Sequence, residues 1–345
     1  MLRPVSLGLT LWLMVVIYCT AVGDTLEQRF QAPPDSYKPM PFWHINGELT
    51  TEGIGRQMKD AKELAGFSGV TVLPLTTGGR KPGTQPDFLS QAYFDRFQDI
   101  LDTAKELDMQ VILYDDIGFP SGMAGGKMEA LYPEHTRKRL DKIEKQVKGR
   151  MRYRDILPGG TLMAAVAMNT QTLERVDLRP FIKDKRLEWQ APTGTWKVMY
   201  FVMVQEGTHK NHLMTDYLDP TAVEHLLSLT YDEYARRFSD SFGKTVQMVF
   251  FDDIGFWKYP RTWTGAFNVK FKELNGFDPW LFYPALWYDI GPDTAAIRNA
   301  FFKTRAELLA EGFPRLVGEW AKKHGLKDTG HPPGNYDPTP IDMNG

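Results

Sequence analysis

The pentapeptide DDIGF occurs twice in this chain, and each copy follows a short apolar run. Asp115–Phe119 comes directly after Val111–Tyr114, and Asp252–Phe256 comes directly after Val249–Phe251. A short apolar run that ends in a turn signal is typical of a buried strand of a parallel sheet, and acidic residues at its carboxyl end face the edge where such folds hold their chemistry. The repetition therefore predicts two acid pairs at two strand ends, which suits catalysis by carboxylates.

Length and charge limit the classes of protein to consider. With 345 residues and 42% hydrophobic content, the chain can bury the core of one α/β barrel or of two smaller domains. A net charge of −2 gives no electrostatic footprint for nucleic acid or for an anionic membrane, so neither partner is expected. The basic stretch Arg137–Arg150 is predicted to be a helix with a solvated charged face.

Residues 1–23 have the features of a secretory signal peptide. Arg3 supplies a positive charge, Leu7–Tyr18 is apolar but too short to span a bilayer, and small residues precede a cleavage site before Asp24. A secreted or periplasmic protein is therefore expected, with no membrane contact beyond this segment. Cleavage also removes Cys19, the single cysteine, which excludes disulfides and a thiol nucleophile from the mature domain. Acylation at Cys19 is the alternative, although the bulky Tyr18 argues against it.

A polar, proline-containing leader over residues 24–38 precedes the domain, which is expected to span residues 36–345. Helices are predicted to begin at Thr50 or Thr51 and at Asp219-Pro220, and an interrupted helical tract is predicted from Thr264 to His324. Short strand-like runs indicate a small antiparallel β insertion at about 150–195. Buried strands are predicted at 41–47, 69–75, 111–114, 196–204, 246–251 and 326–330.

This alternation predicts a TIM-like (β/α)8 barrel that is incomplete, because about six of eight strands are present. A truncated chain or an open sheet would each account for the missing strands.

Six motifs occur along the chain in a fixed order and spacing. They are FWHINGELTTEGI at 42–54, YDDIGFPSGMAGG at 114–126, DYLDPTAV at 216–223, FFDDIGFW at 250–257, RTWT at 261–264 and TGHP at 329–332. In this combination the sequence resembles the α-L-rhamnosidase-like glycoside hydrolases of the family 106 type, and the resemblance runs from about residue 36 to 345. The resemblance implies a catalytic (β/α)8 barrel, export from bacteria that degrade plant polysaccharides, and inverting hydrolysis of an oligo- or polysaccharide that carries rhamnose or a similar deoxysugar. Members usually continue into closing barrel strands and β-sandwich domains that this sequence lacks.

Two acidic positions are the predicted catalytic residues. Inverting hydrolysis needs a general acid and a general base roughly 6.5–9.5 Å apart, and strand ends at one mouth of a barrel can supply them. Asp116 is assigned as the acid and Asp253 as the base, and the reverse assignment stays open. The family commonly has Glu at both positions. Because Asp is one methylene shorter, its carboxylate lies about 1 Å back, and a misplacement on that scale can lower the rate roughly 10²-fold.

Further residues near the strand ends are predicted to bind substrate. Trp43 can stack on a sugar, and His44 and Asn46 can bond its hydroxyls, although Trp43 could instead fill the core. Capping of the next helix competes with substrate contact for Asp216 and Tyr217. The full set of candidates is Trp43, His44, Asn46, Asp115, Asp216, Tyr217, Asp252, Trp263 and His331.

No residue is assigned as a metal ligand, and no cofactor is assigned. Because related rhamnosidases can use calcium for sugar recognition, the resemblance also allows a calcium ion held by Asp115 and Asp252. His209 and His212 have the spacing of a metal pair but lack a third ligand, so an exposed loop is expected.

Three classes of function remain open. The first is a glycoside hydrolase, the second is a non-catalytic carbohydrate-binding relative, and the third is a hydrolase that uses the acid pairs as metal ligands.

Overall fold

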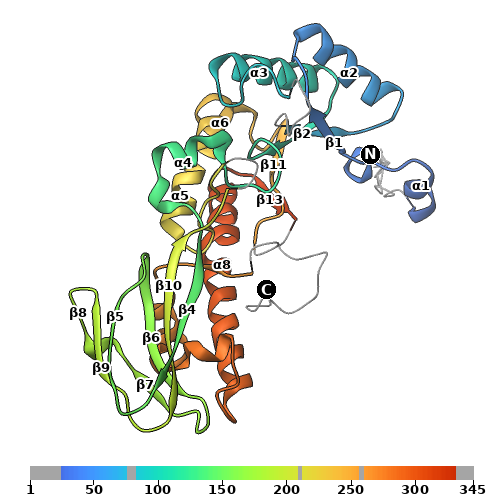
Figure 1. Cartoon of the computed structure of the whole chain (residues 1–345). Helices are drawn as coiled ribbons and strands as arrows, with labels where there is room; N and C mark the ends of the chain where they lie inside the picture. Colours follow the sequence, from blue (N-terminus) through green and yellow to red (C-terminus); the bar gives the residue numbers. More distant parts are fainter. Residues whose placement is uncertain (1–24, 76–82, 209–211, 256–259, 332–345) are drawn as a thin grey trace, which may run out of the picture. The chain divides into compact units, whose positions relative to one another are not determined.

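The structure is a computed structural model that describes residues 25–75, 83–208, 212–255 and 260–331 (Figure 1). The predicted signal peptide lies outside these residues. The chain divides into two compact units, Met1–Lys38 and Pro39–Gly345. The described part of the first unit holds α1 (Leu26–Gln31) and the short helix η1 (Asp35–Tyr37), and none of the residues in these helices is buried. Among the described helices, none is both long and apolar enough to span a bilayer.

A parallel sheet of five strands carries both DDIGF copies in the second unit. The strand order is β1-β2-β3-β11-β13, so the strands lie in the order in which they occur along the chain, although β4 to β10 come between β3 and β11 in the sequence. The strands are β1 (Phe42–Ile45), β2 (Gly69–Pro74), β3 (Gln110–Tyr114), β11 (Val246–Phe251) and β13 (Lys327–Gly330). All five coincide with predicted strands, and because they are parallel their carboxyl ends meet at one edge.

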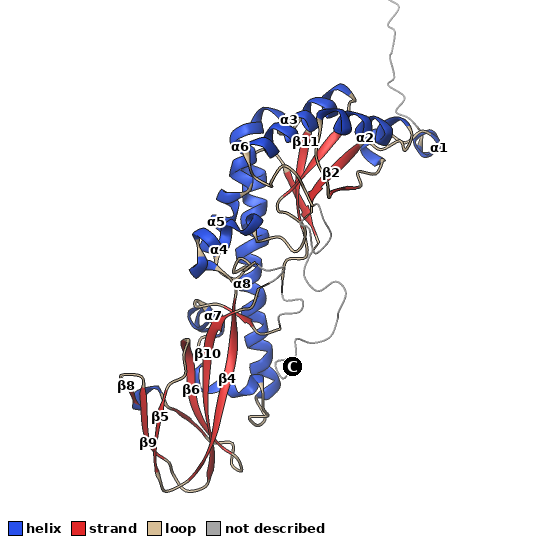
Figure 2. Cartoon of the chain, turned by 45° about the horizontal axis from the view of Figure 1, so that its top comes forward, coloured by secondary structure: helices blue, strands red, loops and turns tan. Residues whose placement is uncertain are grey.

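Helices cover one face of this sheet. Figure 2 shows α2 and α3 lying over the strands, and their apolar side chains form one core with Val72, Leu113 and Val249. On the opposite face, Leu73 and Tyr114 are buried but do not belong to this core. The principal helices of the unit are α2 (Thr51–Glu63), α3 (Gln91–Glu106), α4 (Lys127–Leu131), α5 (Pro220–Leu229), α6 (Tyr231–Phe238), α7 (Phe267–Asn275) and α8 (Thr294–Lys323). The short helices are η2 (Ala124–Gly126), η3 (Pro133–His135), η4 (Arg179–Phe181), η5 (Ser239–Ser241) and η6 (Trp280–Leu286).

The β insertion contains two antiparallel sheets. The strands β4 to β10 run from Lys138 to Gln205 and therefore exceed the predicted range of about 150–195, and β12 joins one of the sheets from further along the chain. One sheet has the order β12-β4-β10-β6-β7 and the other the order β5-β9-β8. The strands are β4 (Lys138–Lys148), β5 (Arg152–Ile156), β6 (Thr161–Asn169), β7 (Arg175–Asp177), β8 (Ile182–Lys183), β9 (Arg186–Gln190), β10 (Thr195–Gln205) and β12 (Thr262–Trp263).

Strand β10 takes part in two separate cores. Trp196, Val198 and Tyr200 face a small core between the two antiparallel sheets, whereas Met199 and Phe201 alternate with them and face the large core that also covers the parallel sheet. Because successive side chains of a strand point to opposite faces, each core covers one face of β10 and both faces are buried. Its sequence is consequently apolar at almost every position, like that of a strand in a parallel sheet.

The predicted (β/α)8 barrel is wrong for the described residues. They form an open parallel sheet of five strands beside two antiparallel sheets. The strand predicted at 196–204 is β10, which pairs antiparallel with β4 and β6 instead of joining the parallel sheet. The error arose because a continuous apolar run indicates burial on both faces but does not identify the neighbouring strands.

The predicted basic helix at 137–150 is also wrong, because these residues form β4, which pairs with β10 along its whole length. The helix starts were predicted correctly. Thr50 caps α2 by accepting a hydrogen bond from the Gly53 N–H, and Asp219 caps α5 by accepting one from the Thr221 N–H. The helix that begins after Asp219 is followed directly by a second one, because α5 ends before Thr230 and α6 begins at Tyr231.

Helix α8 passes very close to the chain that leads into α5. A Cβ atom at Gly312 would lie 2.3 Å from the Tyr217 carbonyl oxygen, whereas a Cβ atom at Gly318 on the same helix would come no nearer than 3.6 Å to the Asp328 carboxylate. Gly312 is therefore needed for the packing of α8, and Gly318 is not.

We expect Gly312→Ala to lower the free energy of unfolding by about 1–3 kcal/mol, because the new methyl group meets backbone that cannot turn away. Gly318→Ala is the matched control and should be neutral or stabilising by up to about 1 kcal/mol, since alanine favours helix. Urea unfolding of both variants measures the difference. Equal effects of the two substitutions would contradict the close packing at Gly312.

Candidate functional site

The two DDIGF copies lie at the ends of neighbouring strands. β3 pairs in parallel with β11, and Tyr114 lies opposite Phe250. Beyond the paired residues, the Asp115 N–H donates to the Phe250 carbonyl at 3.2 Å and the Ser121 N–H donates to the Asp252 carbonyl at 2.8 Å. The backbone therefore holds the segments that follow the two strands against each other.

A buried hydrogen-bond network joins the two acid pairs through Ser121. The Ser121 hydroxyl donates to Asp115 Oδ1 at 2.5 Å and accepts from the Asp252 N–H at 2.8 Å. The Tyr231 hydroxyl donates to Asp115 Oδ2, and the Tyr114 hydroxyl donates to Asp252 Oδ2, both at 2.9 Å. Each of these side chains is buried. Both oxygens of Asp115 are thus occupied by donors from the protein.

Burial raises the pKa of Asp115 well above its ordinary value, and the Asp116 carboxylate adds to this effect, while the hydrogen bonds from Ser121 and Tyr231 oppose it. Burial also raises the pKa of Tyr114, and the negative charge of Asp252 raises it further. Both effects follow from charge placed in a medium of low dielectric constant. Tyr114 therefore remains a hydrogen-bond donor across the ordinary pH range.

Asp116 organises the glycine-rich loop that follows the first DDIGF copy. Its Oδ2 accepts hydrogen bonds from the N–H groups of Gly122, Met123 and Ala124 at 2.7, 2.5 and 2.9 Å. Its Oδ1 accepts from Ile117 and Gly125 at 2.8 and 3.1 Å. Successive N–H groups that converge in this way form an anion-binding nest. The loop therefore wraps around an internal carboxylate.

Positive φ angles make this convergence possible. Gly122, Ala124 and Gly125 have φ values of 124°, 49° and 62°. Glycine adopts such angles without steric cost, so its use at two of these positions is explained by the nest. Asp116 is 0% exposed, and burial raises its pKa against the opposing effect of the backbone N–H donors. Its carboxylate therefore has no surface in contact with solvent.

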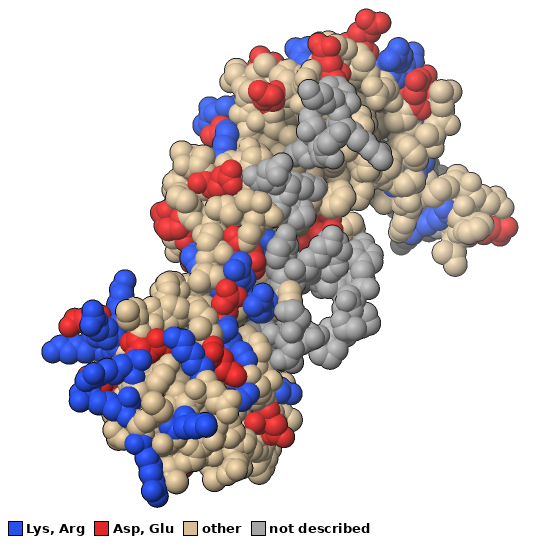
Figure 3. Space-filling model, viewed as in Figure 1, with Lys and Arg blue, Asp and Glu red and all other residues tan. Residues whose placement is uncertain are grey.

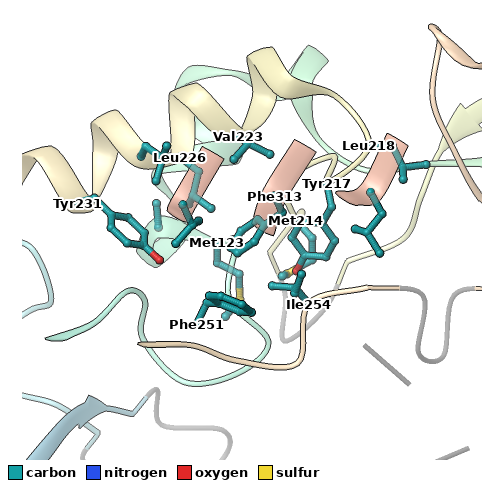
Figure 4. Packing of buried hydrophobic residues seen from close by; sticks show 14 of the residues in the cluster. Met123, Met214, Tyr217, Leu218, Val223, Leu226, Tyr231, Phe251, Ile254 and Phe313 are labelled. Atoms are coloured by element: carbon teal, nitrogen blue, oxygen red, sulfur yellow. The ribbon is translucent and has the colours of Figure 1, made fainter. Parts of the chain in front are cut away.

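Buried apolar side chains fill the space between this loop and the neighbouring helices. Figure 4 shows Met123, Met214, Tyr217, Ile254 and Phe313 gathered between the loop and the helices α5 and α8. The Tyr217 hydroxyl donates a short hydrogen bond to the Ser121 carbonyl. A Cβ atom at Gly122 would lie 2.9 Å from the Tyr217 ring. Tyr217, predicted to bind substrate, is thus buried under the loop and holds its start.

Asp253, His331 and Asp252 form a second, more accessible group. Asp253 is half-buried and has a φ of 48°, a left-handed conformation that Asp tolerates better than most residues. His331 Nδ1 is hydrogen-bonded to Asp252 Oδ1 at 2.6 Å, and its side chain is 39% exposed. Each of the three residues offers one ligand atom, and these atoms lie within 4.8 Å of one another.

The donor set of this group shows which cation it fits. Two carboxylates and an imidazole suit a transition-metal ion or zinc better than calcium, which prefers six to eight oxygen ligands. A calcium ion held by Asp115 and Asp252 does not fit, because both oxygens of Asp115 accept hydrogen bonds. His212 contacts Glu129 at 3.2 Å, and His209 lies outside the described residues.

Trp43 and His44, predicted at the exit of the first strand, lie within β1 and point to opposite faces of the sheet. Trp43 donates from Nε1 to Gln57 on α2 at 3.0 Å and lines a cavity of about 380 Å³ beside that helix. His44 is exposed on the other face, where Phe42 contacts both His44 and His331 through ring centroids 6.2 and 6.1 Å apart. Asn46 is exposed just beyond β1. His44 thus shares a face with His331, and Trp43 does not.

The structure places two further candidates in buried positions. Trp263 is 0% exposed and packs on Phe267 with ring centroids 4.0 Å apart, within the large core. Asp216 is 1% exposed and accepts a hydrogen bond from the Leu218 N–H at 3.0 Å. Burial raises the pKa of Asp216 to about 7, although Lys138 and Thr264 oppose the shift.

Three residues that join the site were missed in the sequence. Ser121 lies in the glycine-rich loop and Tyr114 ends β3, so both lie beside the first DDIGF copy. That proximity could have drawn attention to them. Tyr231, at the start of α6, reaches the site only through the fold, and no local pattern marks it.

Acidic side chains from neighbouring strand ends are consistent with the glycoside hydrolase class, whose members work with pairs of Asp or Glu. The family follows from comparison. The model of glycoside hydrolase family 106, described as alpha-L-rhamnosidase, matches residues 135–340. Since the match covers more than half of the 345 residues, the chain belongs to this family.

The fold is similar to that of a rhamnosidase from Novosphingobium sp. PP1Y. The TM-score is 0.64 at 15% sequence identity, and the similarity covers 89% of this chain. It covers 47% of the other chain, so the present chain spans about half the length of that protein. No curated protein matches the sequence.

We expect Asp116→Asn to lower the free energy of unfolding by about 2–4 kcal/mol, because an amide nitrogen replaces one acceptor and leaves buried N–H groups without a partner. Asp253→Asn should change it by less than about 1 kcal/mol, since Asn also tolerates positive φ. Urea unfolding measures both, and hydrogen exchange at Gly122–Gly125 should accelerate only in the first variant. Unchanged exchange there would show that the nest does not depend on Asp116.

The raised pKa of Asp216 predicts a pH-dependent stability. Between the ordinary Asp pKa of about 4 and the folded value of about 7, the folded chain retains a proton that the unfolded chain releases. The Asp216 contribution to the free energy of unfolding should therefore fall as pH rises through this window, by at most about 1.4 kcal/mol per pH unit. Asp216→Asn, which keeps the acceptor for Leu218, should have a slope that is smaller by this contribution when unfolding is measured from pH 4 to pH 8 in steps of about one unit. The slope that remains comes from other buried groups, such as Asp115 and Asp116, whose pKa values are also raised. An identical slope in both proteins would contradict the assignment.

Proposed function

We propose that this chain contributes the active-site strands of a glycoside hydrolase that cleaves rhamnose-type deoxysugar linkages. The observation that carries the proposal is the pairing of β3 with β11, which places both acidic motifs of a family 106 chain at adjacent strand ends. The fold likeness to a solved rhamnosidase supports it. Plant polysaccharide as substrate, and export to the periplasm or the medium, belong to the same proposal and are motivated by the family resemblance and by residues 1–23.

Asp253 is the proposed general base. It is the more accessible of the two predicted catalytic acids, because it is half-buried whereas Asp116 is 0% exposed. Ligand atoms of Asp252 and Asp253 lie within 4.8 Å, which is closer than the roughly 6.5–9.5 Å expected for an inverting pair. The acid must therefore come from another strand end. Asp116 keeps this role in the proposal, and it requires the nest to release one carboxylate oxygen during the reaction.

The nest also supports a second candidate function, a carbohydrate-binding relative without catalysis. Five backbone N–H groups donate hydrogen bonds to the two carboxylate oxygens of Asp116. This arrangement suits a residue that holds the loop in place better than one that transfers a proton. In that case His331, Asp253 and the exposed His44 would still offer polar contacts to a sugar. Sugar binding without turnover would favour this second function.

The decisive experiment uses p-nitrophenyl α-L-rhamnoside and rhamnose-containing pectic oligosaccharides with the purified chain. We expect Asp253→Ala to lower kcat by about 10²–10⁴-fold, as for the loss of a general base. Added formate should restore part of the activity, because it supplies the missing carboxylate. Asp240→Ala, at an exposed position of η5, serves as control and should retain full activity.

Two outcomes would contradict the proposal. An unchanged kcat in Asp253→Ala would show that Asp253 has no role in catalysis. A first product that keeps the anomeric configuration of the substrate, observed by NMR, would exclude the inverting mechanism. Binding of the same oligosaccharides without any release of sugar would favour the second candidate function.

A further inference from the structure

Charge is unevenly distributed along this chain. Between Lys138 and Gln205 there are 14 lysines and arginines but 7 aspartates and glutamates, which gives the β insertion a net charge of +7. Because the whole chain has a net charge of −2, the remainder carries −9. Figure 3 shows Lys and Arg side chains gathered over the part of the unit that contains β5, β8 and β9. The near-neutral total therefore conceals a strongly basic surface.

The small sheet β5-β9-β8 has an apolar inner face and a basic outer face. Leu187 and Trp189 are buried in the core that it shares with β10. The alternate residues point outward, and pairing places Arg154 opposite Glu188 and Ile156 opposite Arg186. The outward residues, called here the basic face, are Arg152, Arg154, Ile156, Lys183, Arg186, Glu188 and Gln190, and all of them are exposed.

Two arrangements on the basic face point to an external anion. Lys183 and Arg186 lie directly opposite each other across β8 and β9, and like charges in that position destabilise a sheet. Among the residues that the structure describes, neither makes an ion pair. Glu188 is held by both Arg152 and Arg154, so this face already binds one carboxylate between two guanidinium groups. Arginine favours such contacts because its planar donors match a carboxylate.

We infer that the basic face is a secondary binding surface for a carboxylate-bearing glycan, in which uronate residues pair with Arg154, Arg186 and Lys183. The glycan would lie in a groove of about 470 Å³, which is lined by Arg154, Asp155, Ile156, Arg186, Leu187 and Glu188. Ile156 is 69% exposed and offers apolar contact to the C–H face of a sugar ring, while Gln190 can bond hydroxyl groups. The surface is separate from the strand-end acids.

Other polyanions suit the basic face less well. Single-stranded nucleic acid needs exposed aromatic rings for stacking, but Trp189 is buried and Tyr153 packs on the same core. Membrane insertion needs several apolar side chains, and Ile156 is the single large one among the outward residues of these strands. The net charge of −9 elsewhere on the chain would repel an extended polyanion, so binding is confined to this face.

The kind of polymer follows from membership of a glycoside hydrolase family and thus rests partly on the proposed function. Binding itself needs no turnover. A chain that fails to hydrolyse any substrate can still bind uronate at the basic face, and an active chain can fail to do so. Failure of either proposal is therefore distinguishable from failure of the other.

The test is binding of the full chain to polygalacturonate oligosaccharides, measured by titration calorimetry, with the fully methyl-esterified oligosaccharides as uncharged control. We expect esterification to weaken binding roughly tenfold or more, because it removes the charge that arginine recognises. Arg154→Gln combined with Arg186→Gln should weaken binding to a similar extent. Arg56→Gln combined with Lys59→Gln, an equal charge change on exposed residues of α2, should leave it unchanged. Raising the salt concentration should weaken binding, since it shortens the Debye length to about 8 Å at 0.15 M.

Several results would overturn the inference. Equal affinity for the free and the esterified oligosaccharide would exclude recognition of carboxylates. Equal losses in the two double variants would show that binding depends on net charge and not on the basic face. Tighter binding to single-stranded RNA or to phosphatidylserine vesicles than to polygalacturonate would assign this face to another partner. Unchanged thermal unfolding of both variants must accompany the binding data, and exposed side chains make that the expected result.

Discussion

The site depends on the hydrogen bonds that the buried Asp116 carboxylate accepts from the backbone N–H groups of the loop that follows it. Five N–H groups around Asp116 would otherwise face the protein interior without acceptors, which is costly at each donor. Once the loop is closed on Asp116, its first residues place Ser121 between Asp115 and Asp252. The two strand ends are then linked by side chains as well as by the sheet. The position of Asp253 and His331 follows from this closure, because Asp252 bonds to His331 and immediately precedes Asp253.

The sequence was sufficient to predict the strands that carry the acids, because each is a short apolar run that ends in the same motif. It also predicted the capping residues Thr50 and Asp219, whose effect is local. The antiparallel pairing of β10 was not predictable, since burial on both faces gives the same apolar run whichever strands lie beside it. Tertiary contacts of this kind override local pattern, and they explain why a parallel barrel was expected.

The candidate site could be predicted only in part from the sequence, because its tertiary contacts leave no local pattern. Acidic residues at strand ends were recognisable, but the partners of each carboxylate were not. Asp116 looked equivalent to Asp253, yet one is enclosed by backbone donors and the other is half-buried beside a histidine. Trp263 and Tyr217 looked like sugar-binding aromatics, but packing places both in the interior. Whole-chain charge was similarly uninformative, because opposite charges in different segments cancel in the sum.

The two-faced burial of β10 has a consequence for how this architecture can change in evolution. Met199 and Phe201 belong to one core while Val198 and Tyr200 belong to the other, so neither core is complete without the strand. The antiparallel segment is therefore not a module that recombination could exchange between relatives. Its surface is free to diversify, whereas its attachment must be inherited together with the sheet that bears the acids.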